Sequence, residues 1–258
     1  MSYNKELLYG LLSSTLHNVK IYGETDSTSS EARRYALSGG AAPALFIADS
    51  QSGGRGRVGR SFYSPSGTGI YTSLLLPMAD SLADTLLMTS ASAVAVRRAI
   101  LRVTGLDAGI KWVNDLYLDG KKVCGILCEL LSEKKMMIIG VGINLYSSSF
   151  PEEISQTAGS LLTGTADSAL RHALAAEVVK ELLSISDELA DRRFMDEYRA
   201  NSLVLGRELT YIENGISHRG TATDIDDRGR LYILTTDGQT NILSSGEISV
   251  RLDSYRKE

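Results

Sequence analysis

Three arginines stand among glycines in one short segment, Gly53 to Arg60, which reads GGRGRVGR and contains no acidic residue. Guanidinium groups donate paired hydrogen bonds to phosphate or carboxylate, and glycines let the backbone approach a ligand closely. The segment therefore predicts an anion-binding loop. A solvated, flexible surface loop is the main alternative. An RNA-binding arginine patch is a second one, which the net charge of −4 disfavours.

The same segment also fits the G-x-G-x-x-G pattern of dinucleotide-binding folds, through Gly54, Gly56 and Gly59. In those folds the glycine turn runs straight into a helix. Here Arg60 is followed by Ser-Phe-Tyr-Ser-Pro, which does not begin such a helix. The pattern therefore does not indicate a Rossmann fold.

A second group of polar residues, Lys111-Trp112-Val113-Asn114-Asp115, lies at a predicted strand junction. A lysine, an amide and a carboxylate are costly to bury without partners, so a ligand or a metal would satisfy them. A simple turn stabilised by Asn114 and Asp115 is the alternative.

A third group contains two adjacent lysines, Lys121 and Lys122, at the start of a predicted strand. Neighbouring side chains in a strand point to opposite faces, so one lysine faces away from whatever the other contacts. The pattern alone does not decide which of the two faces a site. Lys121 adjoins the Asp119-Gly120 turn, a strong hairpin signal.

The pattern of apolar residues predicts the elements that position these groups. Strands are expected over 44–48, 70–76, 110–113, 116–118, 122–131 and 136–145, and helices over 84–103 and 167–189. Asp167 or Ser168 is expected to cap the second helix. After Asn201 the chain changes to short β-rich runs at 208–212, 220–225, 231–235 and 246–252, which predict a small barrel. We therefore expect two domains, residues 1–205 and 206–258.

The composition is that of an ordinary globular protein, with 43% hydrophobic and 22% charged residues in 258. A net charge of −4 provides no global attraction to nucleic acid or anionic lipid. No stretch predicts a transmembrane helix or a signal peptide, so a cytoplasmic location is expected. Cys124 and Cys128 are expected to be reduced core residues.

Taken together, the motifs resemble the biotin protein ligases, which attach biotin to a lysine of carboxylase carrier domains. The resemblance spans nearly the whole chain and rests on six motifs in one order. These are Thr25-Asp26-Ser27-Thr28, Gln51 before the GRGRVGR loop, KWVNDLYL from Lys111, Lys122 with GILCEL from Gly125, IGVGINL from Ile139, and GEISVR from Gly246.

The resemblance implies an α/β (α+β) fold, with a mixed-sheet catalytic domain and a small C-terminal SH3-like β-barrel. It implies that Arg55, Arg57 and Lys122 take part in the reaction. It implies further contacts with biotin or the nucleotide at Ser27, Thr28, Ser29, Gln51, Gly56, Phe62, Lys111, Asn114, Gly125, Gly140, Gly142 and Asn144.

Some of these implied roles are specific. Ser27, Thr28 and Gln51 resemble the polar contacts to the ureido ring of biotin, and the backbone around Gly140 and Gly142 resembles the strand that walls that ring.

The remaining specific roles concern the reacting groups. The loop from Arg55 to Arg57 resembles the segment that folds over biotin and its adenylate. Lys122 resembles the lysine near the biotin carboxylate and the α-phosphate, and Asn144 a residue near the ribose and phosphate.

Three residues depart from the family pattern. Val113 replaces the usual proline of the K-W-P-N-D motif, Phe62 replaces a tryptophan near adenine, and Ser29 replaces a frequent asparagine. Phenylalanine still offers an aromatic face, so we expect retained activity with weaker nucleotide stacking.

The implied activity is the ATP-dependent ligation of biotin to a lysine of a biotin carboxyl carrier domain, through biotinyl-5′-AMP and with Mg²⁺ as cofactor. The metal ligands are not indicated. The short segment before Thr25 leaves no room for the DNA-binding domain of the repressor members, so no DNA partner is expected. Lipoate protein ligase and a non-catalytic biotin or nucleotide sensor are the alternatives. The oligomeric state is open, a homodimer included.

Overall fold

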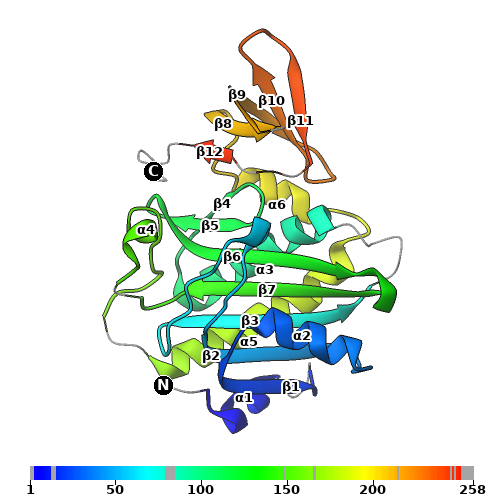
Figure 1. Ribbon diagram of the computed structural model, residues 1–258, viewed down its shortest axis with the longest axis vertical. Helices are drawn as coiled ribbons and strands as arrows, with labels where there is room; N and C mark the ends of the chain where they lie inside the picture. Colours follow the sequence, from blue (N-terminus) through cyan, green and yellow to red (C-terminus); the bar gives the residue numbers. More distant parts are fainter. Residues whose placement is uncertain are drawn as a thin grey trace.

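Two β-sheets organise the chain (Figure 1). The structure is a computed structural model that describes residues 3–12, 16–78, 85–147, 149–164, 167–213, 215–244, 246 and 248–250. The larger sheet has seven strands in the order β1-β2-β3-β7-β6-β5-β4. Their bounds are β1 Val19–Thr25, β2 Ala44–Gln51, β3 Gly69–Pro77, β4 Gly109–Lys111, β5 Asp115–Leu118, β6 Lys121–Leu131 and β7 Met136–Asn144. Only β1 and β2 pair in parallel, so the predicted mixed sheet is confirmed.

Helices cover both faces of this sheet. They are α1 Lys5–Leu12, α2 Thr28–Leu37, α3 Thr85–Thr104, α4 Glu152–Ser155, α5 Ser168–Ile185 and α6 Phe194–Ala200. Strand alternation divides the apolar residues between two clusters. In β2, Ala44 and Phe46 pack with α2, whereas Leu45 and Ile47 belong to the main core, which also holds the buried residues of α3 and α5. On that face α2 packs over β2, β3 and β7 (Figure 1).

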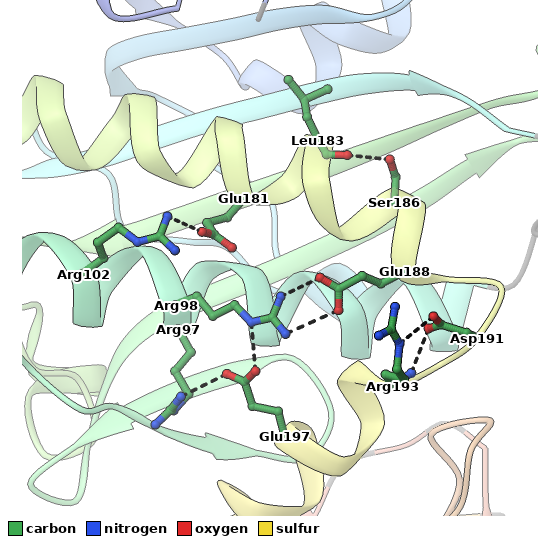
Figure 2. Close-up of polar contacts among 10 residues, drawn as sticks. All are labelled: Arg97, Arg98, Arg102, Glu181, Leu183, Ser186, Glu188, Asp191, Arg193 and Glu197. Atoms are coloured by element: carbon green, nitrogen blue, oxygen red, sulfur yellow. Dashed lines mark hydrogen bonds and ion pairs between the residues drawn. The ribbon is translucent and has the colours of Figure 1, made fainter.

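Arginines on α3 tie the helical layer together (Figure 2). Arg98 forms ion pairs of 2.9 Å with Glu188, just after α5, and of 2.8 Å with Glu197 of α6. Arg97, which is buried, also pairs with Glu197, at 3.2 Å. These contacts fix α6 against α3, and α6 leads directly into the second sheet. Sequence periodicity did not indicate these contacts, because Arg98 lies 90 residues from Glu188 and 99 residues from Glu197.

The second sheet is antiparallel, in the order β11-β10-β9-β8-β12. Its strands are β8 Glu208–Glu213, β9 Ile216–Ile225, β10 Leu231–Thr235, β11 Thr240–Leu243 and β12 Ile248–Val250. Within the residues that the structure describes, β11 and β12 are edges and do not pair, so no closed barrel is present there. Its buried residues join the main core cluster, and the boundary at 205/206 stays a prediction.

The predicted elements are present, with shifts at their ends. The strand expected over 110–113 ends at Lys111, because residues 112–114 form the turn of the β4–β5 hairpin. The Asp167 side chain caps α5 by accepting hydrogen bonds from the amides of Ala169 and Leu170, at 2.8 and 3.2 Å. The predicted start of α3 at Asp84 and the end of the last strand at residues 251–252 lie outside the described residues.

Two further expectations can be checked. Cys124 and Cys128 are unpaired thiols. Burial raises the pKa of Cys128 to about 11, so its thiol stays protonated. No helix in the described part of the chain is long and apolar enough to cross a membrane.

Candidate active site

A cavity of about 220 Å³ lies over β3, β7 and β6, beside the start of α2. Every predicted site residue except Asn144 lines it. The lining comprises Ser27, Thr28, Ser29, Gln51, Arg55, Gly56, Arg57, Val58, Arg60, Ser61, Phe62, Thr72, Lys111, Trp112, Asn114, Asp115, Lys122, Gly125, Ile126, Leu127, Gly140, Val141, Gly142, Gly246, Ile248 and Ser249. Residues that are distant in sequence therefore converge on one space.

Glycines on two neighbouring strands form the floor of the cavity. Gly125 of β6 lies opposite Gly142 of β7. A Cβ atom on Gly142 would lie 2.5 Å from Cε1 of Phe62, and one on Gly140 would lie 2.6 Å from the Ser29 hydroxyl. The missing side chains thus leave the space that the Phe62 ring and Ser29 occupy, and only glycine fits these positions without movement.

A buried chain of hydroxyl and amide groups lines one end. The Gln51 amide oxygen accepts hydrogen bonds from the Thr28 amide at 2.9 Å and from its hydroxyl at 3.2 Å. The Gln51 amide nitrogen donates to the Ser64 hydroxyl at 2.8 Å. The hydroxyl of Ser73 lies 2.8 Å from that of Thr28 and 2.9 Å from that of Ser29. This network fixes the orientation of the Gln51 amide, and sequence reasoning missed Ser64 and Ser73.

The turn that carries Ser27 and Thr28 into α2 is held by an ion pair. Asp26 accepts a hydrogen bond from the Ser27 amide at 2.7 Å and pairs with Arg34 at 2.7 Å. The hydrogen bonds from Arg34 hold the pKa of Asp26 well below its usual range. Asp26 therefore remains ionised and keeps the turn in place.

The arginine loop is a narrow hairpin. The Phe62 amide donates to the Gly54 carbonyl at 2.8 Å, and the Gly56 amide donates to the Arg60 carbonyl at 2.7 Å. At its tip, Val58 has a φ of 53°, a left-handed conformation that a β-branched residue rarely adopts. The Val58 side chain is 77% exposed. The loop is thus ordered by its own backbone, and it does not lead into a helix of the dinucleotide-binding type.

The two predicted catalytic arginines of this loop have different partners. Arg57 donates a hydrogen bond to the Asn114 side-chain oxygen at 3.2 Å. Arg55 donates from both terminal nitrogens to the carboxylate of Glu129, at 3.2 and 2.8 Å. Arg57 thus contacts the β4–β5 turn and Arg55 contacts β6. Of these two contacts, only that of Arg55 is with a carboxylate.

Lys122 enters the cavity because of a β-bulge. The register of β5 and β6 shifts between Leu116, which pairs with Cys124, and Tyr117, which pairs with Lys122. Strict alternation would place Lys122 on the face of Cys124, in the core. Instead its ammonium lies 2.7 Å from a carboxylate oxygen of Asp115. The bulge has no signal in the apolar pattern, so the sequence could not predict this geometry.

Lys121 lies on the other side of the strand. Its ammonium donates to the Gln156 carbonyl, and a Cβ atom on Gly159 would lie 2.4 Å from the Lys121 Cβ. Lys121 does not line the cavity. Lys122 thus lines the cavity, as the resemblance implied, and Lys121 faces away from it.

Asn144 lies outside the cavity lining, in contrast to the predicted ligand contact. Its side-chain nitrogen donates to the Gly159 carbonyl at 3.0 Å and lies 3.5 Å from the Lys122 carbonyl. The amide at the end of β7 thus holds the segment at 159 against the start of β6. Asn144 therefore contacts the backbone of Lys122 and not the cavity.

The turn at residues 112–114 is held from two sides. The Trp112 indole donates to the carbonyl of Gly229, in the turn between β9 and β10, at 2.8 Å, and the Tyr198 hydroxyl donates to the Val113 carbonyl at 3.1 Å. The Trp112-Val113 peptide bond is cis. Asn114 forms paired hydrogen bonds with the backbone of Ile126, both at 2.9 Å. The KWVND motif is therefore both a turn and part of the cavity wall.

Several lining residues were not predicted as site residues. Ile248 and Ser249 belong to β12, and Gly246 lies just before it; the GEISVR motif was the available signal. Arg60 and Asp115 belonged to motifs that were noticed, but neither was assigned a ligand. Within the described ranges, no three His, Cys, Asp or Glu residues are grouped as metal ligands would be. Asp115 is the one carboxylate in the described lining.

The cavity therefore combines two environments. Ser29, part of the hydroxyl and amide network, lies beside Gly140, whereas the Lys122 ammonium lies beside Gly125, one pleat further along the paired strands, and Arg57 and Lys111 also line the space. Such an arrangement suits a ligand with a neutral polar head and an anionic tail, and cations around an anion lower the energy of attack on a phosphate.

Comparison with known proteins yields matches along the chain. Residues 25–144 match the biotin/lipoate A/B protein ligase family, and residues 204–251 match the biotin protein ligase C terminal domain. The chain is 32% identical over 254 residues to the bifunctional ligase/repressor BirA of Bacillus spizizenii, covering 93% of this chain and 77% of that protein. It is 30% identical over 236 residues to the biotin--[acetyl-CoA-carboxylase] ligase of Mycobacterium tuberculosis, covering 88% and 87%.

Among solved structures, the chain is similar to the biotin protein ligase of Aquifex aeolicus in complex with biotin and ATP. The TM-score is 0.75 at 30% identity, over 92% of this chain and 99% of that chain.

Proposed function

Because this chain belongs to the biotin protein ligase family, we propose that it joins biotin to a lysine of a biotin carboxyl carrier domain, with ATP as the energy source. The observation that carries the proposal is the single cavity in which the hydroxyl network, the arginine loop and Lys122 meet. The relatives matched over most of the chain are biotin ligases, so neither the lipoate ligase nor the non-catalytic sensor is retained.

The hydroxyl end of the cavity suits the ureido ring of biotin. That ring has a carbonyl acceptor and two N–H donors, and specificity for such a group requires partners of fixed orientation. Thr28 and Ser73 fix Gln51 and Ser29 through the network described above. We assign these residues to biotin recognition.

The cationic end suits the first chemical step. A carboxylate oxygen of biotin attacks the α-phosphorus of ATP, the bond to the β-phosphate breaks, and pyrophosphate leaves. Both reactants are anions, so cations must reduce their repulsion and stabilise the charge in the transition state. Arg57 and Lys122 are suitably charged and line the same space. No covalent enzyme intermediate is needed.

The second step transfers biotin from the mixed anhydride. The ε-amine of the acceptor lysine attacks the biotinyl carbonyl carbon, an amide bond forms, AMP leaves, and the amine gives up a proton. Asp115 and the phosphate of AMP are the two candidate acceptors of that proton. Asp115 lines the cavity, and one of its carboxylate oxygens lies 2.7 Å from the Lys122 ammonium.

Magnesium is proposed as the metal that accompanies ATP. Mg²⁺ in nucleotide sites is held by substrate phosphates with one or two carboxylates, and Asp115 could supply one. When bound, the ion would neutralise charge on the phosphates. The described residues fit this role and provide no all-protein metal cage.

The proposed partner is the carrier domain of a carboxylase, and the proposed compartment is the cytoplasm, in keeping with two unpaired cysteines. A net charge of −4 gives no support for a DNA partner. Whether the enzyme acts as a homodimer is a question for sedimentation analysis of the purified protein.

The test is biotin-dependent exchange of labelled pyrophosphate into ATP, followed by intact-mass analysis of a carrier domain. Exchange with biotin but not with lipoate, and a carrier heavier by one biotinyl group, are the expected results. Exchange that is equal with lipoate, or an unmodified carrier, would contradict the proposal.

A further inference from the structure

A carboxylate beside the cavity connects the arginine loop to the sheet. Glu129 lies on β6 two residues beyond Leu127, which lines the cavity, so both side chains are on the same face. The Glu129 side chain is 14% exposed. It binds both terminal nitrogens of Arg55, at 3.2 and 2.8 Å. A two-pronged guanidinium–carboxylate contact fixes direction as well as distance.

A second arginine holds this carboxylate from the other side. Arg33 of α2 donates to Oε1 of Glu129 at 2.9 Å, and this oxygen also accepts the 2.8 Å hydrogen bond from Arg55. Three elements that are far apart in sequence, the loop, α2 and β6, therefore meet at one carboxylate. Arg33 and strand β6 hold the Glu129 carboxylate in place. Because Arg55 binds this fixed carboxylate, the contact restrains the loop that carries Arg55.

Arg55 and Arg57 of the loop thus have different partners. Both terminal nitrogens of Arg55 donate to the Glu129 carboxylate, whereas Arg57 donates to the neutral amide oxygen of Asn114. We infer that Glu129 is a positioning residue that holds the arginine loop over the cavity through Arg55, and that Arg55 serves the reaction through this contact and not by binding the phosphate. The inference deepens the proposed function and rests on it for its catalytic meaning.

The loop itself offers a direct measurement. Trypsin cleaves after arginine, and native-state cleavage reports how often a segment opens when opening is fast relative to cleavage. We expect Glu129→Gln to be cleaved roughly three- to tenfold faster after Arg57 and Arg60, the range expected when a partly exposed ion-pair network is lost. Cleavage after Arg55 is left out of the comparison, because the substitution also exposes that side chain.

A mutant cycle separates the contact from other effects. Arg55→Gln should raise cleavage at the same two sites by a similar factor, and the double variant should add little to either single one, because both remove one contact. Arg55→Lys keeps an ion pair without the paired geometry and should give an intermediate rate. The control is Glu188→Gln, which removes a two-pronged contact with Arg98 on the helical layer and should leave loop cleavage unchanged.

Activity then tests the catalytic meaning. With biotin and ATP but no carrier domain, Glu129→Gln should release biotinyl-5′-AMP into solution several-fold faster and raise the KM for ATP, while kcat for pyrophosphate exchange stays within about twofold. A structural defect would lower the thermal midpoint and kcat together. Wild-type cleavage rates in Glu129→Gln, or multiplicative effects in the double variant, would overturn the inference. If Glu129→Gln is cleaved faster but the wild type shows no pyrophosphate exchange, the proposed function is wrong, while the role of Glu129 in holding the loop is retained.

Discussion

Lys122 and Asp115 form an ion pair of 2.7 Å across the β-bulge between β5 and β6, and both side chains line the cavity. The pair joins the lysine assigned to the anionic reactants to the one carboxylate in the described lining. The ion pair already restricts the Lys122 side chain and directs its ammonium into the site. Substrate binding therefore need not restrict that side chain further. Both residues therefore have an orienting partner inside the site.

Lys122→Ala is expected to lower biotin-dependent pyrophosphate exchange by about 10²- to 10³-fold, since it removes a cation from the reacting groups. It also leaves Asp115 without its ammonium partner, so a loss of about 1 kcal/mol in the free energy of unfolding is expected. The measurement pairs exchange kinetics with urea denaturation.

Lys121→Ala is the matched control for that variant. Lys121 contacts the Gln156 carbonyl outside the cavity, so exchange should stay near the wild-type rate. Equal loss of activity in the two variants would show that the assignment of the inward face of β6 is wrong.

Arg57→Ala should impair formation and retention of the adenylate more than stability. Loss of one donor to the transition state is worth about 2 to 4 kcal/mol, whereas a loop arginine changes unfolding by about 0.5 kcal/mol or less. Exchange rate, release of biotinyl-5′-AMP and thermal midpoint are the three readouts. Arg193→Ala, at an exposed arginine paired with Asp191, is the control that should change none of them. An Arg57→Ala protein with wild-type exchange and retention would remove this role.

Gly142→Ala should act through Phe62. A Cβ atom there would lie 2.5 Å from the ring, so the ring must move, and overpacking of this kind carries a penalty of about 1 to 3 kcal/mol. We expect at least a tenfold loss of kcat/KM in exchange, partly restored by adding Phe62→Leu. Gly23→Ala in β1 is the control, since no atom lies within 4 Å of the added Cβ. Full activity in Gly142→Ala would show that the position of the ring is irrelevant.

A buried ion pair should give the protein a distinct acid sensitivity. Asp49 pairs with Arg171 at 2.7 Å, and the two residues are 5% and 2% exposed. Burial acts to raise the pKa of Asp49, but hydrogen bonds from Ser66 and Arg171 outweigh it, and the net pKa is lowered. A carboxylate with a lowered folded-state pKa stabilises the fold above its unfolded value of ~3.9, and this contribution is lost as the pH falls through the folded value.

Asp49→Asn tests this pair. At pH 7 the variant should lose about 3 to 5 kcal/mol of unfolding free energy, because the Arg171 charge remains buried without its partner. As the pH falls below ~3.9 toward the lower folded-state pKa of Asp49, the difference from wild type should shrink. Urea denaturation from pH 7 to pH 3 measures both. A difference that is constant over this range would contradict the linkage.

Much of the site was accessible from local sequence. The GRGRVGR segment indicated an anion-binding loop because arginine and glycine have properties that hold in any context. The apolar runs of β2, β3, β6 and β7 predicted strands, since a short apolar run bounded by turn residues is typical of a buried strand, and β2 and β3 are indeed buried on both faces. Gly140 and Gly142 could be assigned through a resemblance of ordered motifs.

The rest depended on contacts between residues distant in the chain. Local pattern could not show that Arg55 meets Glu129, or that the Trp112 indole reaches Gly229. Such partners are set by how strands and helices pack, and one guanidinium can pair with any carboxylate that the fold brings near. For the same reason Asn144 was expected at the ligand but donates to Gly159.

The sequence by itself determined the chemistry available to this protein, which consists of cations, hydroxyls and glycines in ordered motifs, together with most of the strands that carry them. The tertiary structure decided how Lys122 comes to face the cavity. A one-residue shift in the pairing of β5 with β6 turns Lys122 away from the core, and such a shift depends on the partner strand, which no periodicity within β6 records.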